Sequence, residues 1–157
     1  MAGYRGGFWH RDDFRLTTDP SEIDMGAVHA FLCQSYWAQG IPLEVVQKAV
    51  AHSLNFSLLR GDQLVGFARV ISDHATFAYV SDVFVLPEFR GHGLAIWMMT
   101  CILAHPQLQG LRRWCLATRD AHQLYARVGF ERTKIPERWM EKLDTEVYQR
   151  GDQPRTL

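Results

Sequence analysis

The fold is decided by residues 83–95, which read Val83-Phe-Val-Leu-Pro-Glu-Phe-Arg90-Gly-His-Gly-Leu-Ala95. The run that leads into them, Ala75–Leu86, is rich in β-branched and aromatic residues and predicts a strand that ends at Pro87. The run that follows, Leu94–Ala104, is almost wholly apolar and predicts a helix buried on most of its sides. Two glycines therefore lie between a strand and a helix N-terminus. In that position free N–H groups and the helix dipole favour an anion, and glycine lets a phosphate approach closely.

The sequence on both sides of this stretch predicts a mixed β-sheet. Three strands, Leu54–Arg60, Gln63–Ile71 and Ala75–Leu86, are separated by short turns and predict an antiparallel meander. A further strand at Arg112–Thr118 follows the apolar helix, and a strand-helix-strand unit of this kind forms a right-handed parallel crossover. We therefore expect an α/β (α+β) fold whose sheet is mostly antiparallel with one parallel βαβ crossover, and with helices on both faces.

Further elements are predicted at both ends of the chain. A short strand at Phe14–Thr17 precedes a helix that begins near Asp19, and a second helix opens at Pro42. After the parallel crossover, Asp120 is placed to cap a short helix that Gly129 ends. Two short strands complete the predicted order, at Phe130–Ile135 and Trp139–Leu143.

Length and charge narrow the class of protein. The 157 residues fit one domain, which we place at residues 1–149, followed by a polar tail at 150–157. The 17 Lys and Arg residues equal the 17 Asp and Glu residues, so no charge excess favours nucleic acid or an acidic membrane surface. No run approaches the roughly 20 apolar residues that span a membrane. The N-terminus is polar and the three cysteines lie far apart, which is typical of a cytoplasmic protein with reduced thiols.

The glycine-containing stretch does not match the common nucleotide-binding patterns. No Lys-Ser/Thr pair follows Gly93, and position 96 is Ile where GxGxxG needs a third glycine. The pattern [Q/R]xxGx[G/A] does fit, with Arg90, Gly93 and Ala95 at its fixed positions. Together with Val85-Leu-Pro87 upstream and the LYxxxGF element at 124–130 downstream, it resembles the Gcn5-related N-acetyltransferase (GNAT) superfamily, of the small bacterial type.

The resemblance implies a GNAT fold and an acyl-CoA-dependent N-acetyltransferase (EC 2.3.1.-). Such an enzyme transfers acetyl from acetyl-CoA to a primary amine of a small molecule or peptide, by direct attack in a ternary complex. In this family the strand before the glycines splays from the next parallel strand, and the pantetheine arm of the cofactor lies in the gap. The implied cofactor-binding residues are Val83, Phe84 and Val85 for the arm, Arg90, Gly91, His92, Gly93, Leu94 and Ala95 for the pyrophosphate, and Thr118, where relatives often have Asn.

The residues also indicate catalytic and acceptor-binding candidates. Tyr125 matches the tyrosine that protonates the leaving CoA thiolate in this family, and a tyrosine packed in the core is the alternative. Asp82 is a carboxylate in an apolar strand and is a candidate base. Relatives carry Glu-Asp where this chain has Ser81-Asp82, so a water chain and a purely structural Asp82 are alternatives. We expect the acceptor pocket to be lined by Tyr36, Trp37, Arg69 and Tyr79.

Alternatives exist for function, metal content and assembly. A non-catalytic CoA-binding or regulatory module and an acyltransferase for a longer acyl-CoA would carry the same motifs. The seven histidines have no metal-ligand spacing, so we expect no metal site. The apolar helix, with Trp97, Met98, Met99 and Ile102, is either buried within the chain or forms the interface of a homodimer.

Overall fold

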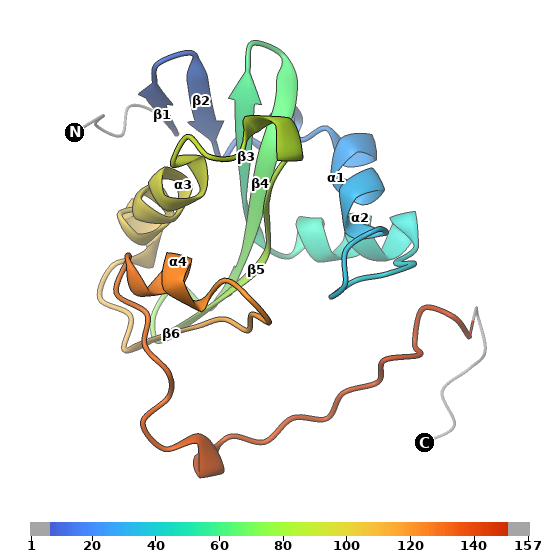
Figure 1. Cartoon of the computed structure of the whole chain (residues 1–157), viewed down its shortest axis with the longest axis vertical. Coiled ribbons are helices and arrows are strands. Elements are labelled where there is room, and N and C mark those ends of the chain that lie inside the picture. Colours follow the sequence, from blue (N-terminus) through green and yellow to red (C-terminus); the bar gives the residue numbers. More distant parts are fainter. Residues whose placement is uncertain (1–6, 151–157) are drawn as a thin grey trace.

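A six-stranded sheet forms the centre of the structure, a computed structural model that describes residues 7–150 (Figure 1). The strands follow one another across the sheet in chain order. Neighbouring strands are antiparallel except β5 and β6, which are parallel, so the predicted fold class is confirmed. The strands are β1 (Phe8–Arg11), β2 (Phe14–Thr17), β3 (Leu54–Arg60), β4 (Gln63–Ser72), β5 (Phe77–Val85) and β6 (Arg113–Cys115).

Helices cover both faces of this sheet. The pair α1 and α2 lies on one face, and α3 and α4 lie on the other, with α3 joining β5 to β6 (Figure 1). No helix within residues 7–150 has the length and hydropathy of a membrane span. The α-helices are α1 (Met25–Leu32), α2 (Leu43–Ala51), α3 (Leu94–Leu103) and α4 (His122–Ala126). Four 3₁₀ turns among the described residues occupy Pro20–Glu22, Pro87–Phe89, Pro106–Leu108 and Pro136–Arg138.

Two apolar cores lie on the two faces of the sheet. On the α3 face, Met98, Met99 and Ile102 are fully buried against residues of the strands. On the other face, α1 and α2 bury Phe67 and Phe84. Most apolar side chains of α3 are therefore covered within one chain, with Trp97 half-buried, and this helix does not require the homodimer interface that its sequence also allowed.

A β-bulge interrupts the pairing of β4 with β5. Phe67 pairs with Phe84 but Arg69 pairs with Ser81, so β5 carries one more residue than β4 between these pairs. Asp82 lies at the bulge with φ of +54°, a left-handed conformation in which Asp is found more often than most residues. The bulge turns the Asp82 side chain toward the site described below.

Gly66 in β4 is required by a close backbone approach. A Cβ atom at this position would lie 2.9 Å from the carbonyl oxygen of Phe84 and 3.1 Å from Cδ2 of Leu58. We expect Gly66→Ala to lower the free energy of unfolding by about 1–3 kcal/mol, the usual cost of overpacking. Chemical denaturation measures the change. Gly26→Ala in α1 is the control, because the added Cβ makes only an ordinary 3.6 Å contact, and an unchanged midpoint for Gly66→Ala would contradict the prediction.

Some predicted elements differ from the structure in extent. The strand predicted at 112–118 is shorter, because β5 and β6 pair over only three residues before the chains diverge. Strand β1 was not predicted; it is four residues long and joins β2 through Asp12, whose φ is +50°. The first α-helix begins at Met25, and Asp19 caps only a 3₁₀ turn. Asp120 does not cap α4, since the Thr118 hydroxyl accepts the N–H of Ala121 there.

The two strands predicted near the C-terminus are absent. Residues 130–149, here called the arm, form no strand and run away from the sheet (Figure 1). A strand needs a hydrogen-bonding neighbour, and the arm pairs with no strand within residues 7–150. The polar tail predicted at 150–157 lies outside the described residues, apart from Arg150.

Candidate active site

The loop between β5 and α3 has the geometry of an anion site. Gly91 and Gly93 have φ of +84° and +71°, values that glycine adopts at little cost. Gly93 is the N-cap residue of α3, and no side chain caps the first turn of that helix. The first N–H groups and the positive end of the helix dipole are thus available to a phosphate.

Two arginines hold this loop. The Nε of Arg90 donates to the carbonyl oxygen of Val85 at 2.8 Å, which leaves both Nη groups without a partner among the described residues. Arg11, at the end of β1, donates to the carbonyl oxygens of Gly93 (3.1 Å) and His92 (3.2 Å). In a trans peptide the N–H points opposite to the carbonyl. By holding these two carbonyl oxygens, Arg11 therefore directs the N–H groups of Gly93 and Leu94 away from itself. Sequence patterns could not indicate Arg11, which lies 82 residues from Gly93 in the chain.

The parallel strands β5 and β6 separate beyond their first three residues. Phe77, Ala78 and Tyr79 pair with β6, and the rest of β5 has no partner on that side among residues 7–150. The side chains of Phe84 and Val85 are buried, and the Phe84 ring stacks on Phe31 with centroids 3.9 Å apart. At Phe84 and Val85, only backbone groups are therefore offered to a ligand between the strands.

A pocket of about 330 Å³ opens where the strands separate. One wall is the stretch Tyr79–Val83 of β5, and the other is formed by residues 117–121 with Tyr125 of α4. The pocket brings together predicted residues from three distant parts of the chain: Tyr36, Trp37, Tyr79, Asp82, Val83, Thr118 and Tyr125. Arg69 and the glycine loop do not line it.

Tyr125 is half-buried at this pocket. Its ring packs edge-on against Phe130, with centroids 6.0 Å apart. Burial, with a smaller effect of nearby Tyr36, raises the pKa of Tyr125 to about 12. Because its pKa is raised, the hydroxyl keeps its proton. No described residue hydrogen-bonds this hydroxyl, so it is available to donate to a ligand in the pocket.

The loop between α1 and α2 forms the mouth of the pocket. The Tyr36 hydroxyl accepts the backbone N–H of Arg119 at 3.0 Å, and the Arg119 guanidinium lies 3.9 Å from the centroid of the Tyr36 ring. Trp37 packs edge-on against Tyr36 and tilts onto Phe31. These contacts join the α1–α2 loop, on one face of the sheet, to the β6–α4 loop across the gap beside the unpaired part of β5.

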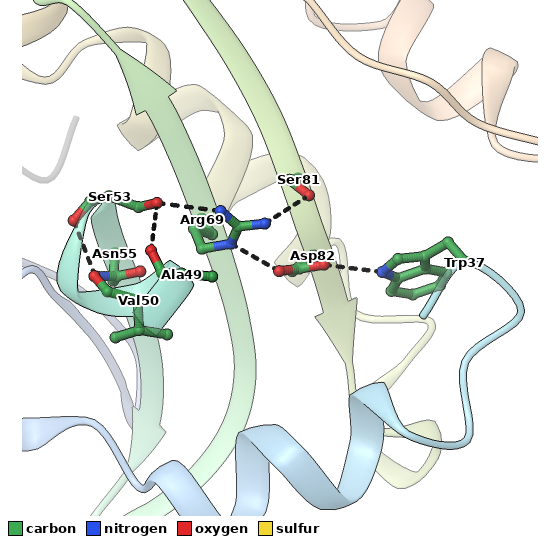
Figure 2. Close-up of polar contacts among 8 residues, drawn as sticks. All are labelled: Trp37, Ala49, Val50, Ser53, Asn55, Arg69, Ser81 and Asp82. Carbon is green, nitrogen blue, oxygen red and sulfur yellow. Dashed lines mark hydrogen bonds and ion pairs between the residues drawn. The ribbon is translucent and has the colours of Figure 1, made fainter. Parts of the chain in front are cut away.

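A buried polar network surrounds Asp82 (Figure 2). One carboxylate oxygen accepts from Nε of Arg69 at 2.8 Å, and the other accepts from the Trp37 indole at 3.0 Å. Arg69 also donates to the hydroxyl oxygens of Ser53 (3.1 Å) and Ser81 (3.3 Å). The Arg69 and Asp82 side chains are 14% and 10% exposed. Arg69, which was expected to contact the acceptor, thus acts within this structure on Asp82.

A sequence model of the acetyltransferase (GNAT) domain family matches residues 51–132, just over half of the chain. The chain belongs to the GNAT family. The matched residues run from the end of α2 to the start of the arm, so they include the glycine loop and both parallel strands.

Individual relatives support membership of the GNAT family. FG08082 of Gibberella zeae, which bears an acetyltransferase name, is 31% identical over 142 residues, covering 76% of this chain and 79% of its own. A GNAT-family crystal structure from Xanthomonas campestris pv. campestris is 51% identical with a TM-score of 0.84, and the match covers 86% of this chain and 96% of that one. An acetyltransferase from Clostridium acetobutylicum, solved with acetyl-CoA, shares the fold at 16% identity with a TM-score of 0.61, over 83% of this chain and 94% of that one.

Acetyl-CoA is the acetyl donor of the GNAT fold, and the described residues fit its chemistry. The uncapped start of α3 suits a pyrophosphate, and a Cβ on Gly91 would meet nothing within 4 Å, so the loop leaves open space beside it. The unpaired edge of β5 suits the amide groups of a pantetheine arm. Within residues 7–150 no cluster of three His, Cys, Asp or Glu side chains could hold a metal ion.

The cysteines lie away from the pocket. Burial raises the pKa of the Cys101 thiol to about 12, and burial also raises the pKa of Cys115. None of the three cysteines lines the pocket of about 330 Å³, although Cys115 lines the neighbouring cavity that Tyr125 also borders. A thiolate nucleophile therefore has no support in this GNAT site.

Proposed function

We propose that this GNAT protein is an acyl-CoA-dependent N-acetyltransferase that transfers acetyl from acetyl-CoA to a primary amine of a small molecule or a peptide. The observation that carries the proposal is the shared pocket. The Tyr125 hydroxyl, with its raised pKa and no protein partner among the described residues, lies in the same cavity as the unpaired edge of β5. A donor along that edge would present its thioester beside a proton source.

The cofactor-binding residues follow from the same geometry. Backbone groups of Val83, Phe84 and Val85 would bind the pantetheine arm. The β5–α3 loop would bind the pyrophosphate through the Arg90 side chain and through backbone N–H groups of the five residues that follow it. These residues are Gly91, His92, Gly93, Leu94 and Ala95. Thr118 would keep its hydrogen bond to Ala121 while its backbone faces the pantetheine arm of the cofactor. The Clostridium acetobutylicum protein, which has the same fold and was solved with acetyl-CoA, supports acetyl-CoA as the ligand.

Proton movements accompany the transfer at both the amine and the sulfur. Acetyl-CoA supplies the acetyl group as a thioester, and the neutral amine attacks its carbonyl carbon. The Tyr125 hydroxyl gives its proton to the sulfur as the C–S bond breaks, the nitrogen gives its surplus proton to solvent as the amide forms, and the phenolate regains a proton from solvent. The amine must first lose a proton, because an ammonium has no lone pair. Asp82 lines the pocket, but both its carboxylate oxygens already accept hydrogen bonds, so we assign the proton to a water chain.

Asp82 is then a positioning residue, and a conservative variant tests this role. Asparagine is tolerated at φ of +54° and keeps the shape of the side chain, but its single acceptor oxygen cannot serve both Arg69 and Trp37 as the two carboxylate oxygens do. We expect Asp82→Asn to raise the amine KM about tenfold, because Trp37 loses its anchor at the pocket mouth, equivalent to about 1.4 kcal/mol. A kcat loss of about a hundredfold or more would instead make Asp82 the base. Steady-state kinetics with varied amine separates the two results.

The acceptor is expected to be a small amine with an apolar or aromatic body. Tyr36, Trp37 and Tyr79 provide aromatic surface at the pocket. The charged residues lining the pocket, Asp82, Arg119 and Asp120, each have an ion-pair partner. A strongly charged acceptor thus finds no unpaired counter-charge among these lining residues.

Thiol release tests the proposed activity. Free CoA is measured with acetyl-CoA and a panel of aromatic amines, amino acids, polyamines and peptides, while thermal unfolding is followed with and without acetyl-CoA. We expect acetyl-CoA to raise the melting temperature and at least one amine to release CoA. A thermal shift without turnover would favour a CoA-binding module, and faster turnover with a longer acyl-CoA would favour that donor. No thermal shift would overturn the cofactor assignment.

A further inference from the structure

The arm exposes large apolar side chains. Met140 and Leu143 are 96% and 70% exposed, and Trp139 is 44% exposed. Exposure this complete is uncommon for such residues unless a partner covers them. The sequence pattern predicts a strand at 139–143, yet this segment has no strand neighbour within residues 7–150.

Strand β6 is the open edge of the sheet beside which the arm begins. It pairs with β5 on one side, and no described strand pairs with its other side. Such an edge presents unpaired N–H and C=O groups to any further strand. The arm starts at Phe130, whose ring packs against Tyr125. Phe130 lines one cavity together with Trp114 and Cys115 of β6, so the edge of β6 and the start of the arm lie side by side.

A groove lies between this edge and the inner half of the arm, residues 130–139. Two adjoining cavities, of about 740 and 850 Å³, form the groove. Both cavities are lined by Trp114 and Cys115 of β6 and by residues 131–133 of the arm. The inner half of the arm is already a wall of this groove. A segment that fills it would add a strand to β6, as in β-strand addition.

The groove and the outer half of the arm, residues 140–149, have complementary charges. The cationic residues lining the groove outnumber its single carboxylate, Glu131; they are Arg112, Arg113, Arg132, Lys134 and Arg138. The outer half carries three carboxylates, Glu141, Asp144 and Glu146, against one Lys142. Asp144 pairs with Arg150, while Glu141 and Glu146 have no ion-pair partner within residues 7–150. The segment that fits this groove by charge is the chain's own outer half.

The outer half does not lie in the groove of its own chain. After Trp139, whose ring lies 5.1 Å from the Arg113 guanidinium, the arm runs away from β6 toward the side of the molecule with α2 (Figure 1). Near its end Tyr148 packs against the core that α1 and α2 form. The outer half therefore leaves the β6 edge of its own chain uncovered.

We propose that the outer half of the arm inserts into the groove of a second copy of this chain, and that two copies exchange arms about a two-fold axis. Each copy then covers the open β6 edge of the other and buries Met140 and Leu143. This gives the homodimer a different interface from the apolar helix α3. Because Ala117, Thr118 and Tyr125 line both the groove and the candidate active site, the partner's arm also lies beside that site.

The mass of the protein in solution is the first test. Light scattering coupled to size exclusion should give twice the mass of one chain for the wild type. Leu143→Asp in the arm, and Arg132→Glu/Lys134→Glu in the groove, should each give a folded monomer, because these side chains are exposed within one chain. Lys48→Glu on α2 is the matched control and should stay dimeric.

Mixing the two monomeric variants distinguishes exchange from any other dimer. In a mixed dimer, the intact arm of the groove variant meets the intact groove of the arm variant, so one of the two exchanged contacts is restored. We expect native mass spectrometry to show a heterodimer of the two variants and circular dichroism to show both folded. A monomeric wild type, a dimeric Leu143→Asp variant, or a mixture that stays monomeric would overturn the proposal.

Discussion

Tyr125→Phe is expected to lower kcat about a hundredfold, the lower end of the range for loss of a general acid. Phenylalanine keeps the ring and its contact with Phe130, so the fold and the pocket shape are preserved. What it removes is the only proton that α4 presents to the pocket. Steady-state thiol release measures kcat, and the thermal shift with acetyl-CoA should match that of the wild type. A kcat within about threefold of wild type would remove Tyr125 from the reaction.

The pH dependence of the wild type supplies a second check on Tyr125. An acid must hold its proton to act, and a raised pKa extends the range in which it does so. With the pKa of Tyr125 at about 12, the phenol stays protonated below pH ~10, the ordinary value for tyrosine. We therefore expect kcat to show no descending limb in that range. A descending limb near neutral pH would require a different acid.

Gly93→Val is expected to weaken acetyl-CoA binding by about 10- to 100-fold. A β-branched residue at φ of +71° is strained by roughly 1–3 kcal/mol, and the loop relieves the strain by rotating the peptides on either side. That rotation turns the first N–H groups of α3 away from the pyrophosphate and disturbs the two bonds from Arg11. Isothermal titration with acetyl-CoA measures the loss, which converts at 1.4 kcal/mol per tenfold.

Gly110→Val is the matched control for Gly93→Val. Gly110 has φ of +73° and lies between α3 and β6, with nothing within 4 Å of an added Cβ. Both variants should lose similar stability from backbone strain. Only Gly93→Val should lose affinity, and equal affinity losses in the two variants would show a general effect of stability in place of a phosphate loop.

Local patterns were enough to predict most of the sheet and α3. The strand-like runs at 54–60 and 63–71, separated by a Gly61-Asp62 turn, place β3 and β4 to within one residue. The apolar run at 94–104 predicts α3 equally well. The prediction failed at 130–143, where the residues have a strand pattern but pair with no strand within residues 7–150.

The candidate site was predicted in part. Tyr125, Thr118 and Val83 follow from motifs in one continuous stretch and do meet at one pocket. The hydrogen bond between Arg69 and Asp82 does not follow from any motif, because β4 and β5 bring the two residues together only through the bulge. Arg11 lies in a strand of four residues with no motif, and its contact with the glycine loop closes across the sheet.

By itself, the sequence determined the order of strands and α-helices between Phe14 and Gly129, the glycine loop before α3 and membership of the GNAT family, because these depend on residues close together in the chain. Only the tertiary structure decided which groups hold the loop, what Asp82 contacts and where the arm goes. Those features are contacts between residues far apart in the chain. Their energies depend on distance and direction in space, which spacing along a sequence does not record.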